Sequence, residues 1–293
     1  MTVIGTESEP VSDMLSQHKC QQVINPGLTG NSADYPLREW LYFVPTRDAT
    51  MDLQTETWTD MADAETDLAL LPVGSTEQHG PHAPLGTDTL DAEAVAERGA
   101  ERYDDPVVVA PPVPVGVAEE HRAFTGTLWT SESTFRSYVR DIVRSLASHG
   151  WDHVVLVNGH GGNIDALREV SGTITRHDEA FAVPFTWFNA VGDHSTDMGH
   201  GGPLETSLLQ HTNPETVHED RLDEAADGGS DGWGEWQSGV NLAFDSDEFT
   251  ENGVVGDPRE GSAERGETLL ELATESLVDL LDEIADRPAG PRS

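Results

Sequence analysis

Short apolar segments alternate with amphipathic segments from about residue 51 to the C-terminal end. The apolar segments are 68–73, 107–110, 154–157 and 181–187. Uninterrupted apolar strands are typical of a parallel sheet buried on both faces, because a strand with one solvated face alternates apolar and polar residues. We therefore predict four buried strands in one mostly parallel sheet.

The segments between these strands have helical patterns. Residues 91–103 are rich in Ala and Glu, and further helices are expected from about 164 and from Pro203. After a capping Ser131, apolar residues recur every three or four positions, at Phe135, Val139, Ile142 and Leu146. A last long helix carries one apolar stripe, formed by Leu270, Leu277, Leu281 and Ile284. Strands alternating with helices predict an α/β fold with ligands at the carboxyl ends of the strands.

The first 50 residues differ from the rest of the chain in charge. They hold six of the 54 acidic residues, three of the 16 basic residues, the single lysine and the single cysteine. They show no helical or strand period. We expect residues 1–50 to be a poorly ordered extension, or translated sequence upstream of a true start at Met51, and residues 51–293 to form the folded domain.

The formal net charge of −38 excludes a basic nucleic-acid-binding protein and disfavours an anionic membrane surface. Acidic residues outnumber basic ones more than threefold, which is typical of halophilic proteins, in which salt screens the self-repulsion. An acidic protein from an ordinary environment is the alternative.

The cysteine content and the N-terminal sequence favour a cytoplasmic location. A single cysteine, Cys20, excludes a disulfide framework and a cysteine-based zinc site. Glu7, Glu9 and Asp13 stand where a signal peptide needs basic and apolar residues. The apolar run 106–118 contains four prolines and is too short to span a bilayer.

Histidines and acidic residues cluster in the Gly-rich turns after the predicted strands. Glu77 and His79 are two residues apart and can face one pocket, to which Asp88 can return after the turn around Gly86. Carboxylate and imidazole groups together suit Zn²⁺ or Mn²⁺. A solvated loop is the alternative for this segment.

A second cluster, 157–163, lies between a strand and a helix and contains His160 among three glycines. Glycines let backbone amides approach a ligand closely, so Gly161 and Asn163 are candidate substrate contacts. A plain turn is the alternative, and the segment fits neither the P-loop nor the dinucleotide motif.

A third cluster, 197–207, offers Asp197 and His200 as an acid/base pair, in which the carboxylate would orient the imidazole. Two polar residues in a salt-adapted loop are the alternative. Glu205 would lie in the first turn of a helix, where its charge suits the helix dipole. In a fourth segment, 120–127, His121 is a candidate substrate-facing residue or a turn histidine.

Taken together, these motifs resemble the creatininase family of metal-dependent amidohydrolases from about Leu68 to the C-terminal end. The matching segments are 72–82, Asp88, His121 with 126–127, 158–163, 200–207 and 253–258. The resemblance implies a three-layer α/β/α sandwich, two divalent metal ions per chain (Zn or Mn, with Fe as an option) and a homo-oligomer, usually a hexamer.

The resemblance also implies roles for individual residues. Glu77 and His160 would hold one metal ion, His79 the other, and Asp88 would bridge both. Gly162 stands where creatininases proper carry a metal-binding Glu. We therefore assign the missing carboxylate to Glu205, as the Gly-Gly branch of the family suggests.

The implied activity is hydrolysis of a non-peptide C–N amide bond by a metal-bridging hydroxide, with His200 and Asp197 delivering the proton. The small-molecule substrate would be a cyclic amide such as creatinine, or a formamide. Two enzymatic alternatives are a formamidopyrimidine deformylase of archaeal riboflavin or deazaflavin synthesis, and a peptidase that matures a peptide-derived redox cofactor. An inactive metal-binding protein is the non-enzymatic alternative.

Overall fold

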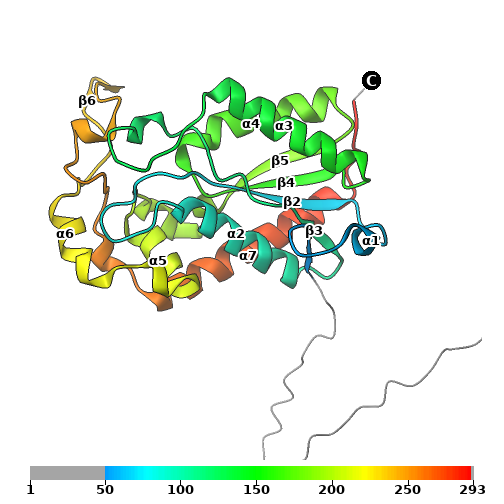
Figure 1. The fold of residues 1–293 in the computed structure, drawn as a ribbon, viewed down its shortest axis with the longest axis horizontal. Coiled ribbons are helices and arrows are strands. Elements are labelled where there is room, and N and C mark those ends of the chain that lie inside the picture. Colours follow the sequence, from blue (N-terminus) through cyan, green and yellow to red (C-terminus); the bar gives the residue numbers. More distant parts are fainter. Residues whose placement is uncertain (1–49, 292–293) are drawn as a thin grey trace, which may run out of the picture. The chain divides into compact units, whose positions relative to one another are not determined.

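The computed structural model describes residues 50–291, in which a parallel sheet lies between two layers of helices (Figure 1). The sheet has the order β1-β3-β2-β4-β5, and all neighbouring strands run parallel. The strands are β1 (Thr50–Asp52), β2 (Leu68–Val73), β3 (Val107–Val109), β4 (His153–Asn158) and β5 (Phe181–Thr186). The three-layer α/β/α prediction is confirmed, with β1 as an additional edge strand. The prediction for residues 1–50 lies outside the described residues except at Thr50, which is the first residue of β1.

The central strands β2 and β4 are buried along their whole length. Leu68 and Leu70 point into one core cluster, and Ala69 and Leu71 point into the other. Successive side chains of a strand face opposite sides of a sheet. Because helices cover both sides, every position of β2 must be apolar, which explains the continuous apolar run in the sequence.

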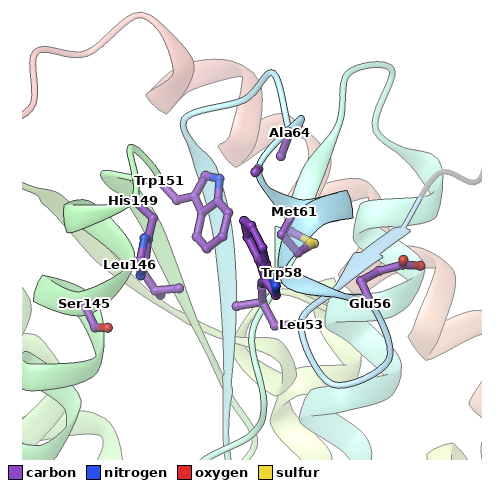
Figure 2. Close-up of a pocket in the computed structure, with 10 residues that line it drawn as sticks. Leu53, Glu56, Trp58, Met61, Ala64, Ser145, Leu146, His149 and Trp151 are labelled. Carbon is purple, nitrogen blue, oxygen red and sulfur yellow. The ribbon is translucent and has the colours of Figure 1, made fainter. Parts of the chain in front are cut away.

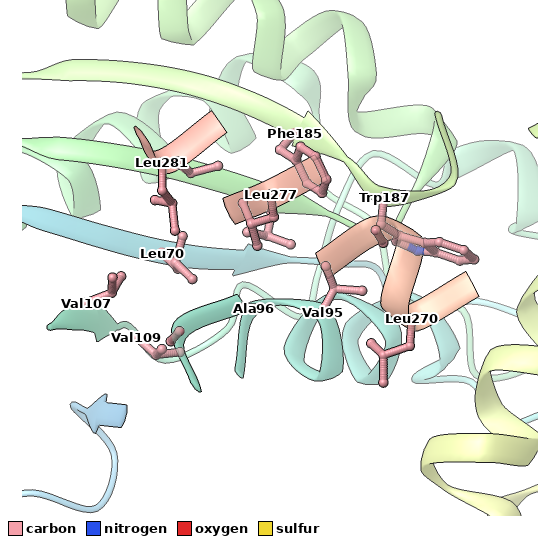
Figure 3. Packing of buried hydrophobic residues seen from close by; sticks show 14 of the residues in the cluster. Leu70, Val95, Ala96, Val107, Val109, Phe185, Trp187, Leu270, Leu277 and Leu281 are labelled. Carbon is pink, nitrogen blue, oxygen red and sulfur yellow. The ribbon is translucent and has the colours of Figure 1, made fainter. Parts of the chain in front are cut away.

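The helices divide between the two faces of the sheet. Their bounds are α1 (Trp58–Met61), α2 (Thr87–Arg102), α3 (Glu132–Ser148), α4 (Ile164–His177), α5 (Pro203–Thr212), α6 (Leu222–Asp227) and α7 (Ala263–Ala285). Helices α3 and α4 cover one face, and α2 and α7 cover the other (Figure 1). Figure 3 shows Leu70 of β2 packed with Val95 of α2 and Leu277 of α7.

Helix α2 begins at Thr87, four residues before the predicted start. Asp88 lies in its first turn and Asp91 directly after that turn, and both are buried although they are acidic. A buried polar turn has no apolar stripe, so the helical period was visible only further along the chain. This early start places Asp88 at the carboxyl end of the sheet.

Loops at the carboxyl ends of β2 and β4 meet α5 and a small hairpin on one side of the molecule (Figure 1). The hairpin consists of β6 (Trp236–Gln237) and β7 (Val240–Asn241), which pair antiparallel. The hairpin is a separate two-stranded sheet and does not pair with the five-stranded sheet. Within residues 50–291, no helix is both long and apolar enough to cross a membrane.

A hollow of about 520 Å³ opens at the amino ends of the strands (Figure 2). Its walls are mainly apolar and include Leu53, Trp58, Met61 and Trp151. None of the residues that the sequence singled out for chemistry lines this hollow. The candidate chemistry therefore lies at the opposite ends of the strands.

Candidate metal centre

Five of the predicted site residues meet at the carboxyl ends of β2 and β4. Glu77 and His79 lie in the loop after β2, Asp88 in the first turn of α2, His160 in the loop after β4, and Glu205 in the first turn of α5. All five are at most 4 % exposed. Segments that are far apart in the sequence thus bring ionisable side chains to one buried place.

Glu77, Asp88 and His160 form the first group that can hold a cation. The Nδ1 atom of His160 lies 3.2 Å from Oε1 of Glu77 and 3.2 Å from Oδ2 of Asp88. One ligand atom from each of the three residues lies within 4.8 Å of the others. Two oxygens and one imidazole nitrogen at this spacing suit a divalent transition metal.

The second group uses the other oxygen of Asp88. The Nε2 atom of His79 lies 3.0 Å from Oδ1 of Asp88 and 3.9 Å from Oε2 of Glu205. Asp88 therefore presents one oxygen to each group, which is the arrangement of a bridging carboxylate.

Several carboxylate oxygens of the first group have no hydrogen-bond partner. These are both side-chain oxygens of Glu77 and Oδ2 of Asp88, and all three are buried. In the described part of the chain, the ion pairs of Glu77, Asp88 and Glu205 are made with histidines alone. Leaving buried charged oxygens unpaired is costly, so the site fits bound cations.

The pKa values of the cluster reflect strong mutual attraction. Burial alone would lower the pKa of His79, but the charges of Asp88, Glu205 and Glu77 raise it to about 10. Burial raises the pKa of Glu205 to about 7, against the opposing charge of His79. The positive charge that these carboxylates need is supplied either by protons on histidines or by cations, so cation binding is expected to release protons.

His121 and His200 lie beside this cluster, and both line a cavity of about 300 Å³. Their rings stack with centroids 4.2 Å apart and an interplanar angle of 18°. The Nε2 atom of His121 lies 3.4 Å from Oε1 of Glu77. Both histidines therefore line the cavity beside the cluster.

The structure does not bring Asp197 to His200. The Oδ2 atom of Asp197 accepts a hydrogen bond from Arg265 of α7 at 2.6 Å, and the Asp197 side chain is 51 % exposed. His200 instead donates through Nε2 to the backbone oxygen of Gln78 at 2.5 Å. Among the described residues, Asp197 thus forms its ion pair with Arg265, and no hydrogen bond or ion pair joins it to His200.

Gly161 and Asn163, both predicted to bind substrate, lie differently relative to the cavity. Gly161 lines the cavity, and a Cβ at this position would meet no atom within 4 Å. Asn163 is fully buried, donates to the Gly74 oxygen at 3.0 Å and accepts from the Val117 nitrogen at 3.0 Å. The hydrogen bonds of Asn163 thus connect its own loop with the loops that contain Gly74 and Val117.

Three residues near the site were not among the site residues predicted from the sequence. Glu120 and Trp233 line the cavity, and the Trp233 ring meets the His200 ring edge-on at 5.9 Å. Asp91 is fully buried with both carboxylate oxygens unpartnered, and burial raises its pKa well above the usual range. The neighbouring Glu119-Glu120-His121 sequence pointed to Glu120, but nothing in the local pattern marked Trp233 or Asp91.

His82 gives the first testable prediction, which concerns pH. Its Nε2 atom hydrogen-bonds to Oγ1 of Thr206 at 2.9 Å, and burial with the nearby His79 lowers the pKa of His82 to about 4. The unfolded chain takes up this proton near pH 6.5. Stability contributed by neutral His82 is therefore complete above pH 6.5, falls between pH 6.5 and 4, and falls no further below pH 4.

We expect the His82→Gln variant to lose less free energy of unfolding than the unmodified protein between pH 6.5 and 4. The difference should be on the order of 1.4 kcal/mol for each unit of pKa shift. Denaturant unfolding of metal-free protein at several pH values measures it. Parallel pH profiles for the two proteins would count against a neutral buried His82.

Comparisons with known proteins agree with this geometry. A family profile described as creatinine amidohydrolase matches residues 54–281. The mycofactocin precursor peptide peptidase of Mycolicibacterium smegmatis is 37 % identical over 212 residues, which cover 69 % of this chain and 79 % of that protein. The peptidase of the same name from Mycobacterium ulcerans is 41 % identical over 160 residues, and the match spans 61 % of its length and 52 % of this chain.

Creatinine amidohydrolases are also similar to this chain. That of Pseudomonas putida is 29 % identical over 241 residues, covering 74 % of this chain and 89 % of that protein. A solved structure of a manganese creatininase has a TM-score of 0.64 at 26 % identity, covering 81 % of this chain and 100 % of the other. The profile covers most of the described residues and the fold agrees, so this chain belongs to the creatininase family.

Proposed function

We propose that this chain is a metal-dependent amidohydrolase that binds two divalent cations. Glu77, Asp88 and His160 would hold one cation, and His79, Glu205 and the second oxygen of Asp88 would hold the other. The observation that carries this proposal is the set of buried, unpartnered oxygens on Glu77 and Asp88. Mixed oxygen and nitrogen donors favour Zn²⁺ or Mn²⁺, with iron as a further option.

Three of the five proposed ligands are held by a second contact within the chain. His79 donates through Nδ1 to the backbone oxygen of Glu77 at 3.1 Å, and His160 donates through Nε2 to the backbone oxygen of Val117 at 2.7 Å. Glu205 accepts from the Gly201 nitrogen at 2.6 Å. Such contacts fix the tautomer and orientation of a ligand.

When bound, a pair of divalent cations lowers the pKa of a water molecule and polarises the carbonyl of a substrate. The residues around the cavity would bind and orient that substrate. Gly161 leaves room for close approach, while Phe188 and Trp233 supply apolar walls. Glu120 adds a carboxyl group, whose pKa is raised by burial.

We favour an amide bond in a peptide or peptide-like compound as the substrate. The sequence alone favoured a non-peptide amide, but the relatives with identities of 37 % and 41 % are named peptidases. In addition, the apolar rim formed by Trp233 continues onto the hairpin, where Trp236 is 61 % exposed. A small cyclic amide such as creatinine is the second candidate, supported by the likeness to the Pseudomonas putida enzyme.

A substrate panel tests this proposal. Metal-loaded protein would be incubated with short peptides ending in apolar residues, with creatinine and with a formamidopyrimidine, and the products identified by mass spectrometry. Metal-stripped protein is the control for each substrate. Cleavage of peptides supports our preference, release of creatine or formate would replace it with the corresponding alternative, and no metal-dependent product from any substrate would contradict hydrolase function.

We also propose that the protein is a cytoplasmic homo-oligomer adapted to high salt. The net charge of −38 supports salt adaptation, because repulsion between acidic side chains is screened only when salt is abundant. Sedimentation over a range of KCl concentrations tests the oligomer and its salt dependence together. A monomer at every concentration would contradict the hexamer that the family resemblance implies.

A further inference from the structure

We propose that the hairpin segment, residues 233–244, docks the part of the substrate chain that extends beyond the bond to be cut. The docked part is a peptide segment that carries large apolar residues together with Lys or Arg. The inference rests on the proposed hydrolase function and names the class of substrate that this function would serve. It assigns the docking surface to residues outside the two proposed cation groups.

The hairpin segment concentrates the exposed apolar side chains of the molecule. Ten large apolar side chains are exposed within residues 50–291, and half of them lie in this short segment: Trp233, Trp236, Val240, Leu242 and Phe244. Phe244 is 83 % exposed, more than any other of the ten. Because the chain carries a net charge of −38, such a concentration of apolar side chains marks a surface that another molecule covers.

Apolar side chains are exposed on both faces of the hairpin. Trp236 stands opposite Asn241, and Gln237 stands opposite Val240. Successive residues of a strand point to opposite faces, so Trp236 lies on one face, and Val240 lies with Leu242 on the other. A two-stranded hairpin by itself is at best marginally stable in water. The hairpin is therefore stabilised by a chain that covers these side chains.

The hairpin is held in one shape by its turn and by Asn241. Ser238 and Gly239, the two residues of the turn, have φ values of 54° and 81°, the left-handed pair that is typical of two-residue hairpin turns. The Oδ1 atom of Asn241 accepts hydrogen bonds from the backbone nitrogens of Glu235 and Ala243, at 3.0 and 3.1 Å. A surface that is already ordered costs less entropy when a flexible peptide binds to it.

The hairpin segment is continuous with the cavity beside the candidate metal centre. Trp233 lines this cavity, and its ring meets the His200 ring edge-on at 5.9 Å. The Nε1 atom of Trp236 donates a hydrogen bond to the backbone oxygen of Trp233 at 2.5 Å. The indole of Trp236 thus lies beside the residue that forms the cavity wall. A peptide that extends from the cavity past Trp233 therefore meets Trp236 next.

The charge around the hairpin favours a basic ligand. Residues 230–251 contain six acidic residues and no Lys, Arg or His. In the described part of the chain, Asp245 alone among these six forms an ion pair, with Arg122 at 2.6 Å. Asp231 and Glu235 are exposed to solvent. Lys or Arg residues of a docked peptide would complement these carboxylates.

A second copy of this chain fits the surface less well than a basic peptide. Two copies that met through their hairpins would bring the same unpaired carboxylates together, and like charges that face each other oppose association. Every other face of a second copy belongs to a chain in which 54 acidic residues stand against 16 basic ones. The observations therefore favour the substrate chain as the occupant.

Binding of designed peptides to the Trp236→Ala variant tests the inference. The probe is a fluorescein-labelled peptide of three Gly-Phe-Lys repeats, which presents Phe and Lys in any register. Its binding to the full chain without added metal ion is followed by fluorescence anisotropy in concentrated KCl. We expect Trp236→Ala to raise the Kd of this probe at least about tenfold, because a Trp that becomes buried on binding is a typical hot spot.

Two further probes separate the apolar contribution from the charge. With a peptide of Gly-Ser-Lys repeats, Trp236→Ala should change the Kd less than about twofold, since the apolar partner of the indole is gone. A peptide of Gly-Phe-Glu repeats should bind more weakly than the Gly-Phe-Lys probe, and this difference should shrink as the KCl concentration rises. Equal binding of the Lys and Glu probes at low salt would overturn the proposed basic ligand.

Trp58→Ala is the matched control, because Trp58 is 82 % exposed but lies at the amino ends of the strands, and it should leave every Kd unchanged. If Trp236→Ala does not fold, Phe244→Ala is the second variant, and it should weaken the Gly-Phe-Lys probe in the same direction. An unchanged Kd in the folded variant would overturn the inference. A change of oligomeric state in sedimentation would also overturn it, since the hairpin would then lie between copies.

Kinetics with metal-loaded protein separate this inference from the proposed function. For the unlabelled Gly-Phe-Lys peptide, Trp236→Ala should raise KM at least about tenfold and leave kcat within about twofold, because the hairpin lies away from the bond to be cut. Hydrolysis with the same KM in both proteins would overturn the docking surface alone. Absence of metal-dependent hydrolysis of any substrate by the unmodified protein would instead overturn the proposed function.

Discussion

Replacement of Asp88 by alanine is expected to abolish hydrolysis and the binding of both cations. The two oxygens of Asp88 face His79 and His160, at 3.0 and 3.2 Å, so a single side chain serves both groups. Its loss would also leave His79 and His160 without the carboxylate that they share. A bound cation contributes several kcal/mol to transition-state stabilisation, and about 1.4 kcal/mol is a factor of ten, so activity should fall at least about a thousandfold.

Metal analysis of the purified Asp88→Ala variant, with kinetics on whichever substrate the panel identifies, measures both effects. Asp165→Ala is the matched control, because Asp165 occupies the first turn of α4 as Asp88 does in α2, but is 94 % exposed. The control should keep both cations. Two cations per chain in the Asp88 variant would contradict the bridging role.

Substitution of Gly159 by alanine is the second change with a large expected effect. A Cβ at residue 159 would lie 2.0 Å from the backbone oxygen of Asp88, where no real side chain fits. The end of β4 or the first turn of α2 would have to move, and the Asp88 carboxylate would move with it. We expect a loss of about 3 kcal/mol in the free energy of unfolding and at least about a hundredfold loss of activity.

Gly161→Ala tests whether this effect is steric. Both glycines lie in the loop after β4, but a Cβ at Gly161 meets nothing within 4 Å. Its free energy of unfolding and cation content should stay close to those of the unmodified protein, within about 0.5 kcal/mol for stability. Chemical denaturation of the three proteins side by side gives the comparison, and equal destabilisation of both variants would argue against the close contact with α2.

Much of the fold could be predicted from the sequence because its central strands are buried on both faces. The apolar run 68–73 became β2 without change, and the stripe containing Leu277 and Leu281 became α7. The start of α2 could not be placed from its pattern, since its first turn buries the acidic residue Asp88. The hairpin was missed because its two strands have two residues each and most of their side chains are exposed.

The residues that belong to the candidate site could be predicted from the sequence more easily than the contacts that these residues make. Glu77, His79, Asp88, His160 and Glu205 lie in short motifs and meet as expected. The partner of Asp197, however, is Arg265, which lies 68 residues further along the chain. Likewise, the Gln78 side-chain amide hydrogen-bonds to His121 and also to the backbone oxygen of Gly253, which lies 175 residues further along the chain. Such contacts depend on the packing of distant segments and leave no signal in the local sequence.

The position of bound metal ions tests the central claim most directly. Anomalous diffraction from crystals grown with Zn²⁺ or Mn²⁺ would locate them. We predict two peaks, one among Glu77, Asp88 and His160 and one among His79, Asp88 and Glu205. The account would be contradicted by the absence of peaks there, or by a peak confined to the partly exposed group of Asp67, Asp152 and His153 at the other end of β4.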